Sequence, residues 1–177
     1  MAKSKKGSKS KKDNKAEQAE QIIKNHVWFA TIPGWMPVPF LDLVAVTAVQ
    51  IDMIKQLCDL YGKDYSSQRG KAVTLALFNT IGGRLPAYAI RSSLKSIPIV
   101  GWAIGGATLA AFAGASTYAT GLVFKEHFDS GGTLKDINPE SFKEFYKKQF
   151  QKGQEVVEEV VEDMKEEMKN KKEDEKE

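Results

Sequence analysis

An unbroken run of 28 uncharged residues, from position 97 to position 124, is the feature that most constrains how this chain can fold. Its sequence is IPIVGWAIGGATLAAFAGASTYATGLVF. As a helix, at about 1.5 Å per residue, it would reach about 40 Å, which exceeds the roughly 30 Å hydrocarbon core of a bilayer. A buried helix of a water-soluble protein seldom lacks charge over this length. The run therefore predicts a helix that inserts into a membrane or contacts one deeply.

Small side chains recur along this run with a spacing of four residues. Gly101 and Gly105 form a GxxxG motif, and Gly106, Ala110 and Gly114 make a second row. Small residues let two helix backbones approach closely, which stabilises helix pairs in membranes. Water-soluble bundles also use alanine ridges, so the pattern predicts close helix packing in either environment.

Three further helices are predicted before this run. Apolar residues recur at helical spacing over 16–31, and the sequence IPGWMPVP then interrupts the helix with three prolines and a glycine. A second helix is predicted from Pro39, which suits the first helical position, to Tyr61, with Gly62 ending it. A third is predicted over 66–95. The expected fold class is all-α, a bundle or hairpin of apolar helices rich in small residues.

One carboxylate, Asp42, lies near the start of the second predicted helix, within an otherwise apolar stretch. In the opening turn it meets backbone N–H groups that lack helical partners, and the positive end of the helix dipole. On a helical wheel Asp42 shares one broad arc with Gln50, Asp52, Gln56 and Asp59. We therefore expect Asp42 and Gln50 to form a polar seam between helices, rather than a functional carboxylate within a membrane.

The start of the chain is strongly basic. Residues 1–15 carry seven lysines and one acid, and this segment is predicted to be disordered. Two roles stay open for it: a basic arm that binds anionic lipid or nucleic acid, and a tail that only keeps the protein in solution.

The end of the chain is charged as well, with thirteen acids and nine lysines from residue 140 onward. After a loop over 129–137, a helix is predicted over 138–177, with Asn138 as its N-cap, Pro139 in its first position and a frayed end. One stripe of this helix is apolar and is expected to dock a partner: Phe142, Phe145, Tyr146, Phe150, Val156, Val157, Val160, Val161, Met164 and Met168. The chain thus divides into a tail over 1–15, a helical, membrane-associated domain over 16–128, the loop and the terminal helix.

No nucleotide-binding loop is predicted. Such a loop needs the pattern GxxxxGK[ST], whose backbone amides hold phosphates. The two Gly-Lys pairs, at 62–63 and 70–71, are preceded by Leu57 and Tyr65 where the first glycine is required. We therefore expect no direct nucleotide binding.

The remaining reactive side chains also form no recognisable site. The single cysteine, Cys58, permits no internal disulfide and suits a reducing compartment. His26, His127 and Cys58 lack the spacing of zinc ligands. An enzyme that pairs His127 with Glu126 or Asp129 is the least favoured hypothesis. We expect no enzymatic activity, no metal and no cofactor, and the absence of a basic face with stacking aromatics argues against nucleic acid.

Residues 37–62 resemble the YcjF-like domain of unknown function of bacterial proteins. The likeness rests on Pro37, Pro39, Asp42, Gln50, Tyr61 and Gly62. The run with Gly101, Gly105 and Gly106 resembles the later hydrophobic segment of that family. The resemblance implies an all-helical, membrane-associated domain that often follows an Era-like GTPase domain, and it brings no catalytic residues. Since no phosphate-binding loop is found here, it implies a standalone module that acts with a separate GTPase.

Taken together, these features favour a non-enzymatic, membrane-associated helical protein of bacteria, serving as an anchor or adaptor. Its expected place is the inner membrane, with both tails in the cytoplasm if an even number of spans is crossed. Its expected partners are membrane lipid and either another protein or a second copy. The alternative is a soluble, cytoplasmic α-helical module that self-associates or binds a partner.

Overall fold

The computed structural model describes residues 3–31, 43–82 and 99–174, and all regular structure within them is helical. The predicted all-α fold class is confirmed. The helices are α1 (Lys3–Thr31), α2 (Leu43–Tyr61), α3 (Ser67–Gly82), α5 (Ile99–Asp129) and α6 (Lys143–Asp174), with a short 3-10 turn, η2 (Pro139–Phe142), before α6.

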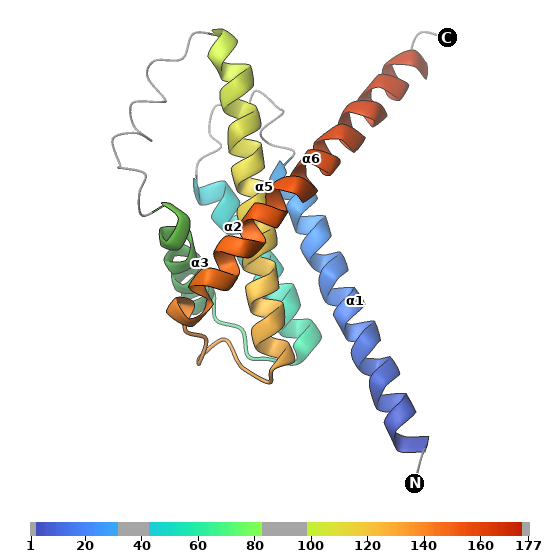
Figure 1. The fold of residues 1–177 in the computed structure, drawn as a ribbon, viewed down its shortest axis with the longest axis vertical. Coiled ribbons are helices and arrows are strands. Elements are labelled where there is room, and N and C mark those ends of the chain that lie inside the picture. Colours follow the sequence, from blue (N-terminus) through green and yellow to red (C-terminus); the bar gives the residue numbers. More distant parts are fainter. Residues whose placement is uncertain (1–2, 32–42, 83–98, 175–177) are drawn as a thin grey trace.

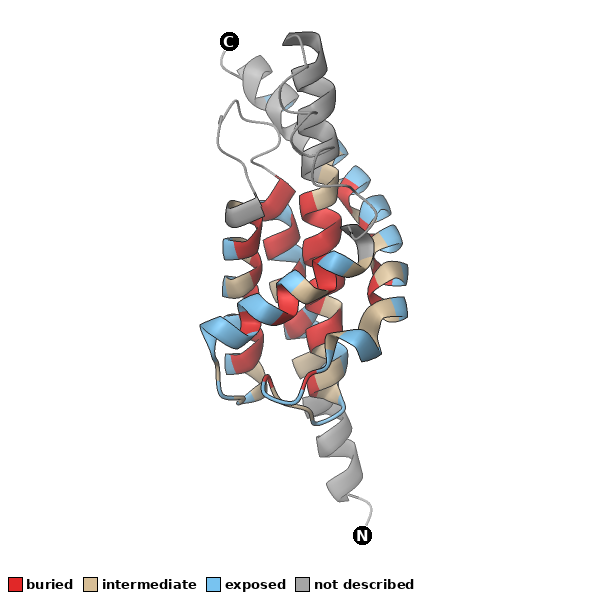
Figure 2. Ribbon diagram, turned by 90° about the vertical axis from the view of Figure 1, so that its left-hand side faces the viewer, coloured by how far each residue is buried: buried red, intermediate tan, exposed pale blue. Residues whose placement is uncertain are grey.

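Helix α5 forms the centre of the bundle, and α1, α2 and α6 pack around it (Figure 1). Helix α1 runs antiparallel to α5, because Thr31 lies beside Gly114 while Ile23 lies beside Gly121. Helix α2 runs parallel to α5, and α6 crosses it diagonally (Figure 1). Figure 2 shows that buried residues line the sides on which these helices face one another.

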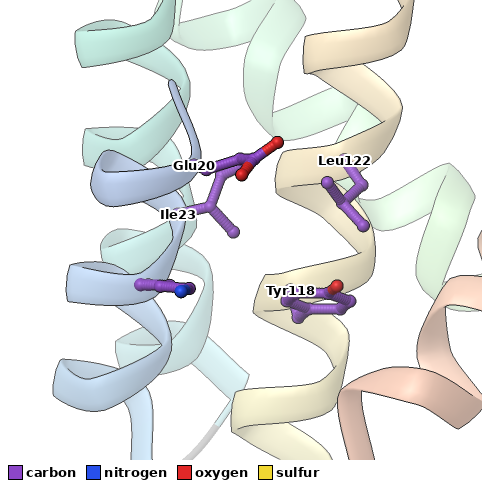
Figure 3. Close-up of a pocket in the computed structure, with 5 residues that line it drawn as sticks. Glu20, Ile23, Tyr118 and Leu122 are labelled. Carbon is purple, nitrogen blue, oxygen red and sulfur yellow. The ribbon is translucent and has the colours of Figure 1, made fainter. Parts of the chain in front are cut away.

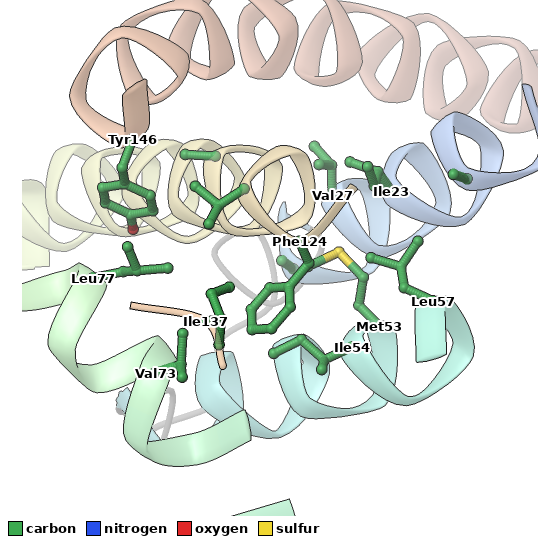
Figure 4. Packing of buried hydrophobic residues seen from close by; sticks show 14 of the residues in the cluster. Ile23, Val27, Met53, Ile54, Leu57, Val73, Leu77, Phe124, Ile137 and Tyr146 are labelled. Atoms are coloured by element: carbon green, nitrogen blue, oxygen red, sulfur yellow. The ribbon is translucent and has the colours of Figure 1, made fainter. Parts of the chain in front are cut away.

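The hydrophobic core is built from large side chains of every described helix. Figure 4 shows them meeting between α5 and the surrounding helices. Burying one such side chain stabilises a fold by about 1.5–3 kcal/mol. The largest that are fully buried are Ile23 and Val27 of α1, Met53, Ile54 and Leu57 of α2, Val73 and Leu77 of α3, Phe124 of α5, Leu134 and Ile137 of the loop, and Tyr146 of α6.

Three glycines allow helix backbones to approach closely. A Cβ atom added at Gly121 would lie 2.6 Å from Ile23 Cγ1 and 3.0 Å from Met53 Sδ. One added at Gly114 would collide with Val157 and Thr31, so α6 and α1 both reach the backbone of α5 at this point. Gly153 of α6 is equally close to Ala115. The small residues of α5 after Ala110 therefore pack against other helices of the same chain.

Of the small residues predicted to pack helices, Gly114 lies in this contact. The other four, Gly101, Gly105, Gly106 and Ala110, belong to the first turns of α5, where side chains lie outside the described residues.

Both predicted helix ends that carry a capping signal are confirmed. Helix α2 ends at Tyr61, and Gly62 has a left-handed φ of 64°. The Lys63 N–H donates to the carbonyl of Cys58 at 2.8 Å, which closes the helix as glycine caps typically do. At the predicted start of the terminal helix, the side chain of Asn138 accepts a hydrogen bond from the N–H of Glu140 at 3.2 Å, and Pro139 follows as the first residue of η2.

The predicted loop over 129–137 is folded onto the bundle. Arg69 at the start of α3 donates hydrogen bonds to the carbonyls of Leu134, Lys135 and Ile137 at 3.3, 3.2 and 3.0 Å. Leu134 and Ile137 are themselves buried. The loop therefore closes one end of the core.

The structure differs from two expectations about the ends of the chain. Residues 3–15, expected to be disordered, form the first turns of α1. Lysine is a good helix former, and a helix fixed by its buried residues from Ala19 onward extends at little cost. Much of the apolar stripe of α6, expected to dock a partner, packs on the core instead, with Tyr146 and Val157 buried, while the side chains of Met164 and Met168 lie outside the described residues.

The predicted helix over 66–95 is present as α3 as far as Gly82. Its later part, like the first positions of the helix predicted from Pro39, lies outside the described residues.

Replacing Gly121 by leucine should lower the free energy of unfolding by about 2 kcal/mol or more, because the new side chain must displace Ile23 and Met53. The gain in helix propensity over glycine, about 1 kcal/mol, offsets only part of this loss. Urea denaturation followed by circular dichroism measures the change. Ala72→Leu, which adds a side chain at an exposed position of α3, is the control. Equal unfolding midpoints for the two variants would contradict the close approach of α1 and α5.

Candidate functional site

The apolar end of the molecule is formed by the first turns of α5. In Figure 1 the first turns of α5 extend beyond the ends of α1, α2 and α3, and the charged C-terminal end of α6 reaches about the same height. None of the twelve residues 99–110 is charged. A helix needs about twelve residues to cover 18 Å, so this projection is long enough to enter roughly half of a bilayer core.

Two aromatic side chains are exposed near the same end. Trp28 and Phe29, in the last turn of α1, are 39% and 56% exposed. Their ring centroids lie 5.7 Å apart at an interplanar angle of 86°. Large aromatic side chains are costly to leave in water and are enriched where a membrane meets water.

The family-motif residues fall in two places. Pro37, Pro39 and Asp42 lie outside the described residues. Tyr61 and Gly62 end α2, and the Tyr61 hydroxyl donates to Asp129 of α5 at 2.8 Å. This second group therefore joins α2 to the end of α5.

Gln50 lies fully buried in a polar seam between α2 and α5. Its amide nitrogen is 3.2 Å from Ser116 Oγ and 3.1 Å from Thr117 Oγ1. Its amide oxygen accepts from Thr120 Oγ1 at 3.4 Å. Because every polar group of this side chain has a partner, the seam aligns two helices and leaves no group free for catalysis.

His127 is held in the loop after α5. Its Nε2 lies 2.9 Å from both the carbonyl of Thr133 and the carboxylate of Asp136. The Thr133 backbone N–H and its hydroxyl also donate to Asp136, at 2.7 and 3.0 Å. These bonds, led by the backbone N–H, lower the pKa of Asp136 to about 2.

The hypothesis that paired His127 with Glu126 or Asp129 is wrong about the partner. Asp129 accepts hydrogen bonds from Tyr61 and Lys125 instead. The Thr133 hydroxyl donates to Asp136 rather than to the imidazole. His127, Thr133 and Asp136 therefore hold the loop in place and do not form a nucleophile with its base.

His26 joins α1 to α2. Its Nδ1 lies 2.7 Å from the carbonyl of Ile22, and its Nε2 lies 3.1 Å from the carboxylate of Asp52. The hydrogen bond from His26 lowers the pKa of Asp52, and Gln56 adds a second donor at 2.8 Å. Sequence reasoning did not find this pairing of His26 with Asp52.

A shallow groove between α1 and α5 is shown in Figure 3. Its volume is about 190 Å³, and its lining is Glu20, Ile23, Lys24, Tyr118 and Leu122. Pockets that bind drug-sized ligands measure about 300–1,000 Å³, so this groove is too small to enclose a ligand of that size. Among the described residues there is also no cluster of three or more His, Cys, Asp or Glu side chains that could hold a metal.

The prediction of a membrane-spanning helix over 97–124 finds no support in the described residues, none of whose helices is both long and apolar enough to cross a bilayer. Within that run, Ala113, Ala115, Ala119, Val123 and Phe124 are buried by the rest of the bundle.

Replacing Asp136 by asparagine should lower the melting temperature near neutral pH, because the carboxylate accepts three hydrogen bonds there. Its folded pKa of about 2 lies below the ordinary 3.8, so its stabilisation is complete above about pH 4 and is lost as the pH falls toward 2. Melting curves of both proteins across this range should therefore converge at low pH. Asp13→Asn, at an exposed position of α1, should leave no such gap; a gap that is constant down to pH 2 would contradict the assignment.

Comparison with known proteins places the fold in a family. Residues 2–155 match the family described as "Domain of unknown function (DUF697)". A relative named "Magnetosome membrane protein 22", from Magnetospirillum gryphiswaldense, is 38% identical over 130 residues, which cover 73% of this chain and 67% of the relative. No solved structure matches. The resemblance inferred from the Pro37–Gly62 stretch is thereby confirmed, and the chain belongs to the DUF697 family of YcjF-like domains of unknown function.

Proposed function

We propose that this chain is a non-enzymatic, membrane-associated helical protein whose apolar end contacts the bilayer. The observation that carries the proposal is the projection of the uncharged first turns of α5 beyond the bundle. The exposed pair Trp28 and Phe29 near the same end supports it. So does the relative, whose name describes a membrane protein.

The apolar end, rather than the lysines of α1, makes this contact. In Figure 1 the first turns of α1 point away from the projecting turns of α5. Lysines at that end cannot lie against the same membrane surface, and their attraction fades over about 10 Å in 0.1 M salt. Burial of apolar side chains does not need anionic lipid, so binding rests on the hydrophobic effect.

The proposed role is that of an anchor or adaptor at the bacterial inner membrane, with both charged ends of the chain in the cytoplasm. The GTPase that often precedes this domain in the family would then be a separate protein. No constellation of described residues argues for catalysis: Gln50 is fully hydrogen-bonded, and His127 staples a loop.

A soluble interaction module is the second candidate. The observation that favours it is the burial of α5 from Ala113 to Phe124 by other helices of the same chain, as in a water-soluble bundle. A monodisperse protein that stays in solution without detergent and does not bind lipid vesicles would support this candidate.

Co-sedimentation with vesicles tests the membrane proposal. The protein should bind vesicles of a zwitterionic lipid about as well as vesicles rich in anionic lipid, and high salt should not release it. Trp28→Ser with Phe29→Ser should weaken binding by about tenfold or more, since each buried aromatic contributes more than 1 kcal/mol.

Leu75→Ser is the matched control, because Leu75 is an apolar side chain of α3 that is similarly exposed, at 43%. It should bind vesicles as the unchanged protein does. Recovery of all the unchanged protein in the supernatant with both kinds of vesicle would overturn the proposal.

A further inference from the structure

Two oppositely charged helical segments stand out from the near-neutral body of the chain. We call residues 3–15 of α1 the basic arm; it holds seven lysines and one acid. We call residues 155–167 of α6 the acidic stripe; it holds seven acids and one lysine. The two segments are equally long and carry charges of equal size and opposite sign.

The acidic stripe faces water. Val157 anchors this part of α6 to the core, while the acids lie on the outer side. Among the described residues of the stripe, all the carboxylates are exposed: Glu155, Glu158, Glu159, Glu162, Asp163 and Glu166. None of the ion pairs in the described part of the chain involves them.

The basic arm cannot reach the acidic stripe of its own molecule. Thr31 and Val157 meet at Gly114, so the stripe lies beside the C-terminal end of α1. The arm is at the opposite end of this continuous helix, and Lys15 lies about 24 Å along the axis from Thr31. In about 0.1 M salt, attraction is largely screened beyond about 10 Å. Figure 1 shows the two ends of the chain far apart.

We propose that the basic arm of one copy docks on the acidic stripe of a second copy, so that the protein assembles through complementary helices. The stripe is the outer face of a helix whose inner residues are already packed on the core. Pairing two stripes, or two arms, would place like charges together, so only the contact of arm with stripe is attractive. The arm points away from the apolar end, whereas the C-terminal part of α6 rises toward it (Figure 1).

Analytical ultracentrifugation of the full chain tests this contact. A nonionic detergent is kept in every sample to cover the apolar end, so that failure of the membrane proposal does not affect the result. The protein should form oligomers in low salt and dissociate to monomers in about 1 M salt, where charges are screened beyond about 3 Å.

Two charge-reversal variants make the test specific. One reverses the arm (Lys5, Lys6, Lys9, Lys11 and Lys12→Glu) and the other reverses the stripe (Glu155, Glu158, Glu159, Glu162 and Asp163→Lys). Each alone should be monomeric in low salt, because both of its surfaces then carry the same sign. Mixing the two should restore oligomers, since the acidic arm of one variant meets the basic stripe of the other.

A helical circular dichroism spectrum for each variant alone excludes misfolding as the cause of its dissociation. Replacing the same five lysines by arginine should preserve assembly. A monomeric unchanged protein in low salt, an unaltered mass for either reversal variant, or a mixture that stays monomeric would each overturn the proposal. So would loss of binding to anionic vesicles by the arm variant without any change in its mass, which would assign the arm to lipid.

Discussion

The close approach of α1 and α6 to α5 is the constraint on which the rest of the bundle depends. At Gly114 both Thr31 and Val157 reach the backbone of the central helix. Protein interiors are packed about as densely as organic crystals, so a larger side chain there would push both helices outward. On the side of α2, Gly121 lets Met53 approach α5, and the hydroxyls of Ser116 and Thr117 lie within hydrogen-bond reach of Gln50. Small side chains on α5 therefore set both the apolar packing and the polar seam.

The parts of the fold that could be predicted are those with a local signal. Gly62 marks a helix end because a left-handed residue is needed there, and Asn138 marks a helix start because its side chain replaces a missing hydrogen bond. The uncharged run misled the prediction for a physical reason: lipid and protein neighbours are both apolar, so composition alone does not separate them. The basic start misled it because a fixed helix extends into lysines at little cost.

In the candidate site, too, the residues with a local sequence signal were predicted and the partners distant in sequence were not. Gln50 was found because it stands on a polar arc of an otherwise apolar helix, which requires a neighbour with hydrogen-bonding groups. The partner of His127 was missed because Asp136 returns to it through a tight turn, nine residues later. The pair of His26 and Asp52 spans two helices joined by residues outside the described structure. A histidine among the apolar residues of α1 and a carboxylate on the polar arc of α2 were the signals that could have suggested it.

The two proposed contacts, that of the apolar end with a membrane and that of the basic arm with the acidic stripe, depend on different forces. Apolar burial at the end of α5 is nearly insensitive to salt, whereas the attraction of arm and stripe is screened by it. Exposed ion pairs are individually weak, so in dilute solution such an assembly is marginal. Confinement to a membrane raises the effective concentration of one copy around another, which strengthens any second contact without adding a new one. In copies held upright by the apolar end, however, the basic arm points away from the membrane while α6 rises toward it (Figure 1), so neighbouring copies must tilt before arm and stripe can meet.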